Sequence, residues 1–250
     1  MNSSTSTLDH EEVQQFAAIA SEWWDYNGKF RPLHVLSPTR LGYINEQICS
    51  HFKLNSKSSG CYDGLKMLDI GCGGGLVAEP LARLRGDVTA IDPAEENIEA
   101  AKIHAKAENL TINYRSIRVE DLVSEDVQFD VVVLLEVVEH VPDVSEFVQV
   151  CSRLVRPGGL FILSTLNRTL KSYALAIVGA EYVLRWVPAG THQWDRFVKP
   201  AELATAVEQC GLEVLDKRGM AYNPIKDSWA LSHDMDVNYF LTCTKPAEAE

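Results

Sequence analysis

The sequence has no long apolar run, no excess of positive charge and no closely paired cysteines. Its 250 residues include 35 Asp and Glu against 23 Lys and Arg, a formal net charge of -12. That charge repels a phosphate backbone and argues against nucleic acid as a partner. The six cysteines form no C-x-x-C pair, which is typical of free thiols in a reducing compartment. The most apolar segment, 173–187, is interrupted by Glu181 and Arg185 and is shorter than the roughly 20 apolar residues of a spanning helix.

The chain does not open with a basic stretch followed by an apolar run, so we expect a cytoplasmic protein. Hydrophobic residues make up 46% of it, which is enough to bury a core. Residues 1–60 predict a helical N-terminal cap, with helices over 11–24 and 39–52 and a break between them that contains Pro32 and Pro38.

Residues 61–250 predict an α/β domain. Short, continuous apolar runs alternate there with helical patterns, which indicates a mostly parallel sheet covered by helices on both faces. Residues 167–190 are an extra, largely apolar helical insertion that this alternation does not require.

A glycine-rich turn over 71–75 follows the first apolar run, with Asp69 two residues before it. Such glycines let a ligand approach the backbone at the carboxyl edge of a sheet. Asp92 ends the next run, about twenty residues on, where a carboxylate can accept hydrogen bonds from a ribose; its alternative role is a helix cap before Pro93. The turn lacks the G-x-G-x-x-G pattern of dinucleotide folds, and Asp69 would repel a pyrophosphate but suits a cationic amino-acid group.

Two carboxylates and an imidazole follow the fourth apolar run: Glu136, Glu139 and His140. A spacing of three places the two glutamates on one side of a helical turn, with His140 adjacent. Oxygen donors with one imidazole suit Mg²⁺ or Mn²⁺. The alternative is a metal-free reaction with His140 as general base, and the residues alone leave both open.

The loop of Asp69, Gly71 and Gly73, together with the alternation, resembles the class I S-adenosylmethionine-dependent methyltransferases. This resemblance implies a Rossmann-like fold with a mostly parallel, seven-stranded sheet, and S-adenosylmethionine as cofactor. It also implies an acidic residue near the adenine after the third strand, which falls on Glu120; the alternative for Glu120 is a solvated turn.

Three blocks outside this core narrow the resemblance: residues 16–25 leading to 32–34 and 40–44, residues 190–200, and residues 219–224. They are similar to the ubiquinone biosynthesis O-methyltransferase family over about 13–244. The family implies methyl transfer to a catechol hydroxyl of polyprenylated intermediates at two pathway steps. It also implies cofactor contacts, which fall on Arg40, Gly71, Asp92 and Leu135. The magnesium site of the family falls on Glu136, Glu139 and His140.

A divalent cation held by both catechol oxygens would stabilise the attacking phenolate. In that case His140 is either a ligand or a base, and His192 or Asp195 approaches the substrate from the insertion. Two other functions stay open: methyl transfer to another phenol or a carbon nucleophile, and a non-catalytic cofactor-binding scaffold.

A polyprenylated catechol or quinol partitions into the bilayer, so the enzyme must reach it at the membrane surface. Residues 170–187 mix aromatic and aliphatic side chains with Lys171 and Arg185, a pattern that favours an interfacial helix. We therefore expect a cytoplasmic protein that is peripheral at the inner membrane, with other ubiquinone biosynthesis proteins as further partners. The alternative for this segment is a lid packed on the sheet.

Overall fold

The computed structural model describes residues 7, 9, 13–14, 17–174 and 194–247. The parallel strands are β1 (Lys66–Ile70), β2 (Asp87–Asp92), β3 (Asn113–Ser116), β4 (Phe129–Leu135) and β5 (Val155–Leu166), and three more follow: β6 (Glu213–Asn223), β7 (Ser228–Ser232) and β8 (Asn238–Thr244). The α-helices are α2 (Arg31–His51), α3 (Ala78–Arg83), α4 (Glu95–Ala107), α5 (Val119–Val123), α6 (Val144–Ser152), α7 (Leu170–Ser172) and α8 (Pro200–Gln209). Short 3₁₀ helices are η1 (Ala20–Glu22), η2 (Val138–His140) and η4 (Trp194–Arg196).

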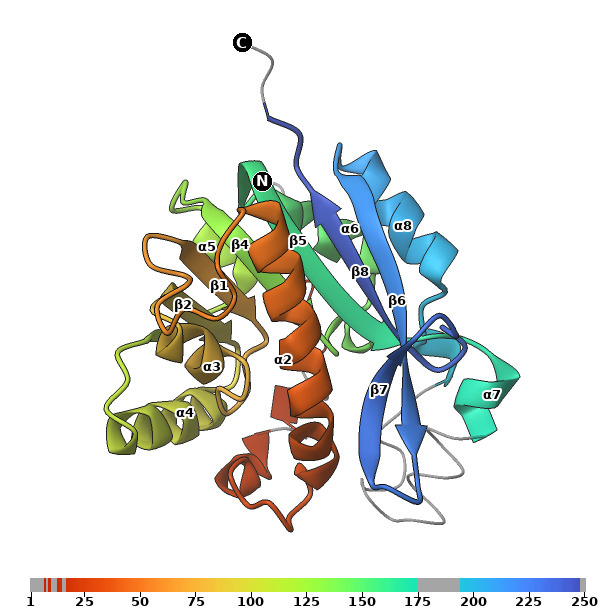
Figure 1. The fold of residues 1–250 in the computed structure, drawn as a ribbon, viewed down its shortest axis with the longest axis horizontal. Helices are drawn as coiled ribbons and strands as arrows, with labels where there is room; N and C mark the ends of the chain where they lie inside the picture. The colour runs from red at the N-terminus through yellow and green to blue at the C-terminus, as the bar shows by residue number, and fades with distance from the viewer. Residues whose placement is uncertain (1–6, 8, 10–12, 15–16, 175–193, 248–250) are drawn as a thin grey trace.

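All eight of these strands form one sheet, in the order β3-β2-β1-β4-β5-β8-β6-β7 (Figure 1). The first five are parallel, and β8 runs antiparallel between β5 and β6. The strand order reverses between β1 and β4, so the carboxyl ends of these strands form the crevice where open α/β sheets bind ligands. The predicted α/β fold with a mostly parallel sheet is confirmed.

The sheet has one strand more than the predicted seven. β6 continues to Asn223, and the chain turns back to pair β7 with it in an antiparallel hairpin. Asp227 adopts a φ of +46° in the turn, and its carboxylate accepts hydrogen bonds from Tyr222 and Arg31. β7 is short and has no fully buried residue, so it lacks the apolar run by which the core strands were recognised.

The N-terminal helices differ from the prediction. α2 begins at Arg31 rather than at 39, with Pro32 in its first turn, where a missing N–H costs little, and it passes through Pro38. The helix predicted over 11–24 lies partly outside the described residues, and it does not reach its predicted end, since η1 replaces it over Ala20–Glu22.

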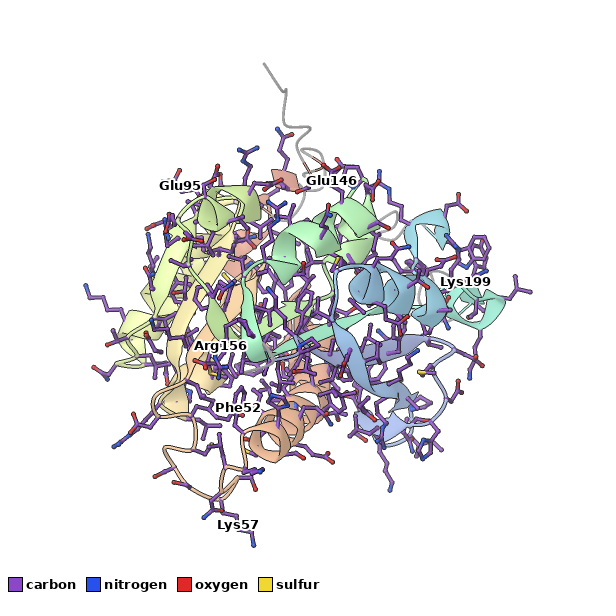
Figure 2. All side chains as sticks on the ribbon, turned by 90° about the horizontal axis from the view of Figure 1, so that it is seen from above. Phe52, Lys57, Glu95, Glu146, Arg156 and Lys199 are labelled. Carbon is purple, nitrogen blue, oxygen red and sulfur yellow. The ribbon has the colours of Figure 1, made fainter. Side chains whose placement is uncertain are left out.

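Helices cover both faces of the sheet, and Figure 2 shows α2 on one face and α6 and α8 on the other. α2 belongs to the same buried cluster as the sheet, through Tyr43, Ile44 and Ile48. Just beyond its end, the Phe52 ring lies 5.8 Å from the guanidinium carbon of Arg156, on β5. The division into a cap over 1–60 and a methyltransferase domain over 61–250 stays a prediction.

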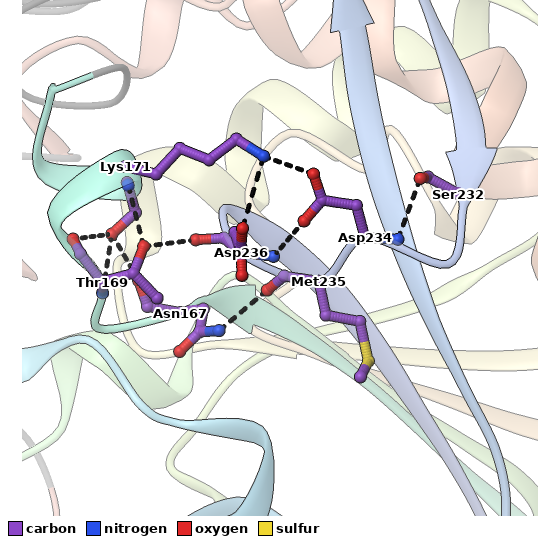
Figure 3. A network of polar contacts seen from close by, with 8 residues as sticks. Asn167, Thr169, Lys171, Ser232, Asp234, Met235 and Asp236 are labelled. Atoms are coloured by element: carbon purple, nitrogen blue, oxygen red, sulfur yellow. Dashed lines mark hydrogen bonds and ion pairs between the residues drawn. The ribbon is translucent and has the colours of Figure 1, made fainter.

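The start of the predicted insertion makes hydrogen bonds and ion pairs to the loop between β7 and β8 (Figure 3). The Asn167 side-chain amide donates to the Met235 carbonyl over 2.8 Å, and the Lys171 ammonium pairs with Asp234 and Asp236. Most of the segment 170–187 lies outside the described residues. Within the part of the chain that the structure describes, no helix combines the length and apolarity that a bilayer crossing requires.

Candidate active site

The glycine turn brings the ends of β1, β2 and β4 together. Gly71 and Gly73 have φ angles of +71° and +52°, which a side chain disfavours. The Gly71 N–H donates to the Ile91 carbonyl over 2.9 Å, so the turn folds back onto the end of β2. A Cβ at Gly71 would lie 2.5 Å from Cγ2 of Val137, in the segment that follows β4. A glycine at 71 therefore allows the close contact between the turn and this segment.

Asp69 and Arg40 form a buried pair of opposite charges beside this turn, each 3% exposed. Burial raises the pKa of Asp69 to about 7, against the opposing effect of the Arg40 charge. Oδ2 of Asp69 and Nε of Arg40 have no hydrogen-bond partner among the described residues. An unpaired buried acceptor and an unpaired buried donor fit the ammonium and the carboxylate of an amino-acid group. The pair therefore fits the methionine end of S-adenosylmethionine.

The Asp92 carboxylate is buried and accepts three hydrogen bonds. Oδ1 accepts from the Ala94 N–H over 2.9 Å and from the Asn97 amide over 3.1 Å, and Oδ2 accepts from the Gly73 N–H over 3.0 Å. Burial is the main cause of its raised pKa. A carboxylate has about four acceptor positions, so Asp92 holds the turn and retains capacity for a ribose hydroxyl.

Glu120 lies in α5, after β3, and its side chain is partly enclosed. Its Oε1 accepts hydrogen bonds from the backbone N–H and the hydroxyl of Thr7. Its Oε2 is buried with no partner among the described residues. Thr7 therefore brings two donors to the carboxylate that the resemblance places near the adenine.

Glu136 and Glu139 follow Leu135, the buried last residue of β4. Glu136 has a φ of +54° and precedes the 3₁₀ turn that contains Glu139 and His140. Ser164 donates to Oε1 of Glu136 and Thr165 to Oε2 of Glu139, each over 2.7 Å. Burial, and then the Glu136 charge, raise the pKa of Glu139 to about 8, while the half-buried His140 acts in the opposite direction.

The predicted three-ligand metal site is not assembled. Among the described residues, no three His, Cys, Asp or Glu side chains are arranged to hold a metal ion. The structure shows instead two carboxylates, Glu136 and Glu139, each with one oxygen bound to a hydroxyl and with charges close enough to repel. A divalent cation would relieve that repulsion. Since Mg²⁺ is often bound through one or two carboxylates plus water and substrate, the pair fits Mg²⁺ without His140 as ligand.

Only one of the two further candidates from the insertion side, His192 and Asp195, lies among the described residues. His192 lies outside the described residues. Asp195 lines a cavity of about 370 Å³ whose lining also includes Val141, the residue after His140. Charged residues, including Arg168 and Glu202, share this lining.

Trp23, Trp24 and Asn97 also contact this site, and the sequence analysis missed these contacts. The Trp23 indole N–H donates to Oδ1 of Asn97 over 2.8 Å, and the Trp24 indole N–H donates to the Gly74 carbonyl over 2.9 Å. Two adjacent tryptophans in an N-terminal segment were the available signal, but they fitted the apolar face of a helix equally well.

Fold and site together define a class I S-adenosylmethionine-dependent methyltransferase. A family model described as a methyltransferase domain matches residues 68–163. The chain resembles the magnesium protoporphyrin IX methyltransferase of Synechocystis PCC 6803, solved with bound SAM, with a TM-score of 0.61 and 15% identity over 98% of this chain and 100% of that one.

Curated relatives at much higher identity define the family. The ubiquinone biosynthesis O-methyltransferase of Brucella anthropi is 52% identical over 97% of this chain and 98% of its own length. That of Mesorhizobium japonicum is 50% identical over 96% of each. The chain belongs to the ubiquinone biosynthesis O-methyltransferase family.

Proposed function

We propose that this enzyme transfers the methyl group of S-adenosylmethionine to a catechol hydroxyl of polyprenylated intermediates, at both O-methylation steps of ubiquinone biosynthesis. The acceptors would be 2-polyprenyl-6-hydroxyphenol and 3-demethylubiquinol. One observation carries the proposal: the glycine turn that follows Asp69 packs against the segment that holds Glu136, since a Cβ at Gly71 would lie 2.5 Å from Cγ2 of Val137. The residues suited to the cofactor's amino-acid end therefore adjoin the acidic pair suited to the acceptor. The names of the curated relatives support this acceptor class.

In this proposal the cofactor lies along the ends of β1, β2 and β4. Asp69 and Arg40 hold its amino-acid end, Gly71 and Gly73 allow close approach, and Asp92 accepts from the ribose. Glu120 lies at the adenine, and Leu135 packs beside the cofactor. Two features of the described residues support this assignment: the unpaired buried atoms of Asp69, Arg40 and Glu120, and the spare acceptor capacity of Asp92.

The acceptor site in this proposal is built on Glu136, Glu139 and His140. A magnesium ion on the two glutamates would supply charge stabilisation for the catechol oxygens. His140 is half-buried beside Glu139, where its imidazole can take the proton of the reacting hydroxyl. Held in line with the sulfonium methyl, the oxygen would then attack the methyl carbon as the carbon–sulfur bond breaks and S-adenosylhomocysteine leaves. Binding both reactants in one site gives an effective concentration far above that in solution.

The deciding experiment is methyl transfer to a short-chain prenyl catechol, with EDTA and then with Mg²⁺ restored. We expect activity to disappear with chelator and to return with the metal. Glu136→Gln and Glu139→Gln should each lose roughly a hundredfold or more in kcat, while the surface control Glu146→Gln keeps full activity. Activity that EDTA does not affect but that is lost in His140→Ala would contradict the metal-dependent mechanism and support His140 as general base. Cofactor binding without transfer to any phenol or carbon acceptor would favour the scaffold.

We propose further that the enzyme is peripheral at the cytoplasmic surface of the inner membrane, which it contacts through 170–187. The exposure of the described start of this segment supports this: Leu170 is 82% and Tyr173 46% exposed. Leu170→Asp should lower flotation with phospholipid vesicles, and the matched control Ile103→Asp, on α4 and 70% exposed in the native chain, should not. Equal flotation of both variants with the native protein would contradict a contact at Leu170.

A further inference from the structure

The indole of Trp23 packs directly on the glycine turn. A Cβ at Gly73 would lie 2.3 Å from Cζ2 of the indole, and one at Gly74 would lie 2.4 Å from the Cβ of Trp23. On its other side the indole stacks on Phe30, with centroids 3.7 Å apart and planes 9° apart. The N-terminal segment therefore forms one wall of the cofactor site, and Trp23 is only 7% exposed.

A chain of two hydrogen bonds leads from this indole to the ribose-binding carboxylate. Trp23 Nε1 donates to Oδ1 of Asn97 over 2.8 Å, and Nδ2 of Asn97 donates to Oδ1 of Asp92 over 3.1 Å. Both side chains of the first bond are buried, Asn97 being 2% exposed.

The chemistry of tryptophan fixes the direction of this chain. An indole N–H can only donate, so the amide oxygen of Asn97 must face Trp23. The amide nitrogen must then face Asp92, where it donates to the carboxylate and favours its charged form. An amide that is free to flip would instead present its oxygen to the carboxylate for part of the time.

We propose that Trp23 and Asn97 are positioning residues for the cofactor: the indole sets the orientation of the amide, and the amide holds the Asp92 carboxylate ready for a ribose hydroxyl. The inference rests on the proposed cofactor role of Asp92 and is independent of the acceptor. It can therefore be tested by cofactor binding alone, so its failure is distinguishable from failure of the proposed acceptor chemistry.

The test is calorimetric titration of the full-length protein with S-adenosylhomocysteine, without acceptor. Trp23→Phe keeps an aromatic ring on the glycine turn and removes the N–H; we expect its Kd to rise about five- to twentyfold. The matched control Trp229→Phe, on β7, should keep the native Kd. In methyl-transfer assays, KM for S-adenosylmethionine should rise in Trp23→Phe while kcat stays within about twofold.

Two further measurements separate positioning from simple support of the fold. Asn97→Leu keeps a side chain of similar size but neither accepts from Trp23 nor donates to Asp92, so we expect a larger loss of affinity than in Trp23→Phe. With an analogue of S-adenosylhomocysteine that lacks the ribose 2′-hydroxyl, the loss in Trp23→Phe should shrink.

Three results would overturn the inference: native affinity in Asn97→Leu, an equal loss in Trp23→Phe for both ligands, or losses that add fully when Trp23→Phe is combined with Asn97→Ala. Melting temperatures of all variants are measured alongside. A variant that does not fold is replaced in the comparison by the other single substitution, which reports on the same hydrogen-bond chain.

Discussion

Asp69 shows how burial makes a single carboxylate responsive to pH. Its pKa is raised to about 7, so below neutral pH it is largely protonated and cannot form the ion pair that we propose with the ammonium group of the ligand. Binding must then release a proton, which higher pH favours. We predict that the affinity for S-adenosylhomocysteine rises by roughly tenfold per pH unit as the pH approaches 7, and levels off above it.

Asp69→Asn removes the titrating charge. We expect it to bind S-adenosylhomocysteine roughly 10- to 100-fold more weakly at neutral pH, with a flatter pH profile. Titration calorimetry between about pH 5.5 and 7.5 measures both. Asp87→Asn, at the exposed start of β2, is the control and should follow the native curve. A native affinity independent of pH would contradict the role given to Asp69.

Alanine substitutions at Gly73 and Gly211 distinguish the cost of backbone strain from the cost of a side-chain clash. Both have positive φ, +52° and +77°, but only at Gly73 does a Cβ meet a neighbour, the Trp23 indole; at Gly211 nothing lies within 4 Å. Gly211→Ala should therefore cost about 1 kcal/mol of unfolding free energy, the strain alone. Gly73→Ala should cost about 1–3 kcal/mol more. Urea denaturation of the two variants measures the difference, and equal losses would show that the indole yields freely.

How far single site residues could be predicted depended on where they lie along the chain. Asp69 and Asp92 end apolar runs, and parallel strands bring such ends to one edge, so sequence position alone suggested their shared site. Asn97 lies on the face of α4 that packs inward, and its partner Trp23 is 74 positions away. No periodic pattern encodes such a pairing. Likewise, the spacing of Glu136, Glu139 and His140 did not reveal the left-handed backbone at Glu136.

Elements show the same limit. The buried strands β1, β2 and β4 were recognisable as continuous apolar runs, because both of their faces are covered. α2 and β7 differ from the prediction. Pro38 indicated a break where the helix in fact continues, and β7 was not predicted because it is too exposed to carry an apolar run. Tertiary contacts, rather than local preference, decide these two elements, since α2 packs on the sheet and β7 pairs with β6.

The hydroxyl of Tyr43 tests how tightly α2 is joined to the sheet. It hydrogen-bonds to Asp216 on β6 over 2.9 Å and to Thr242 on β8 over 2.8 Å. Tyr43→Phe keeps the ring stacked on Phe240 but removes both of these hydrogen bonds, so we expect a loss of about 1–3 kcal/mol of unfolding free energy. Tyr222→Phe, whose hydroxyl is exposed, should lose less than about 0.5 kcal/mol.

The same denaturation curves test the predicted division near residue 60. If α2 and the sheet unfold as one unit, circular dichroism and tryptophan fluorescence should give coincident transitions in the native protein and in Tyr43→Phe. Trp23 and Trp24 report from the N-terminal segment. A fluorescence transition well before the loss of secondary structure would indicate an independent cap.

The whole molecule carries a formal net charge of -12, which constrains how it can approach a membrane. Anionic lipids repel such a protein over about a Debye length, roughly 8–10 Å at physiological salt. For the proposed contact through 170–187, apolar insertion at the interface would then have to outweigh this repulsion. We predict that binding to vesicles weakens as the anionic lipid fraction rises, and that added salt restores it.

Lowering the pH toward the isoelectric point near 5.0 should also abolish this electrostatic penalty, because the net charge approaches zero. Flotation across lipid composition, salt and pH measures all three. Binding that strengthens with anionic lipid and is lost in salt would instead require a cationic face that overrides the net charge.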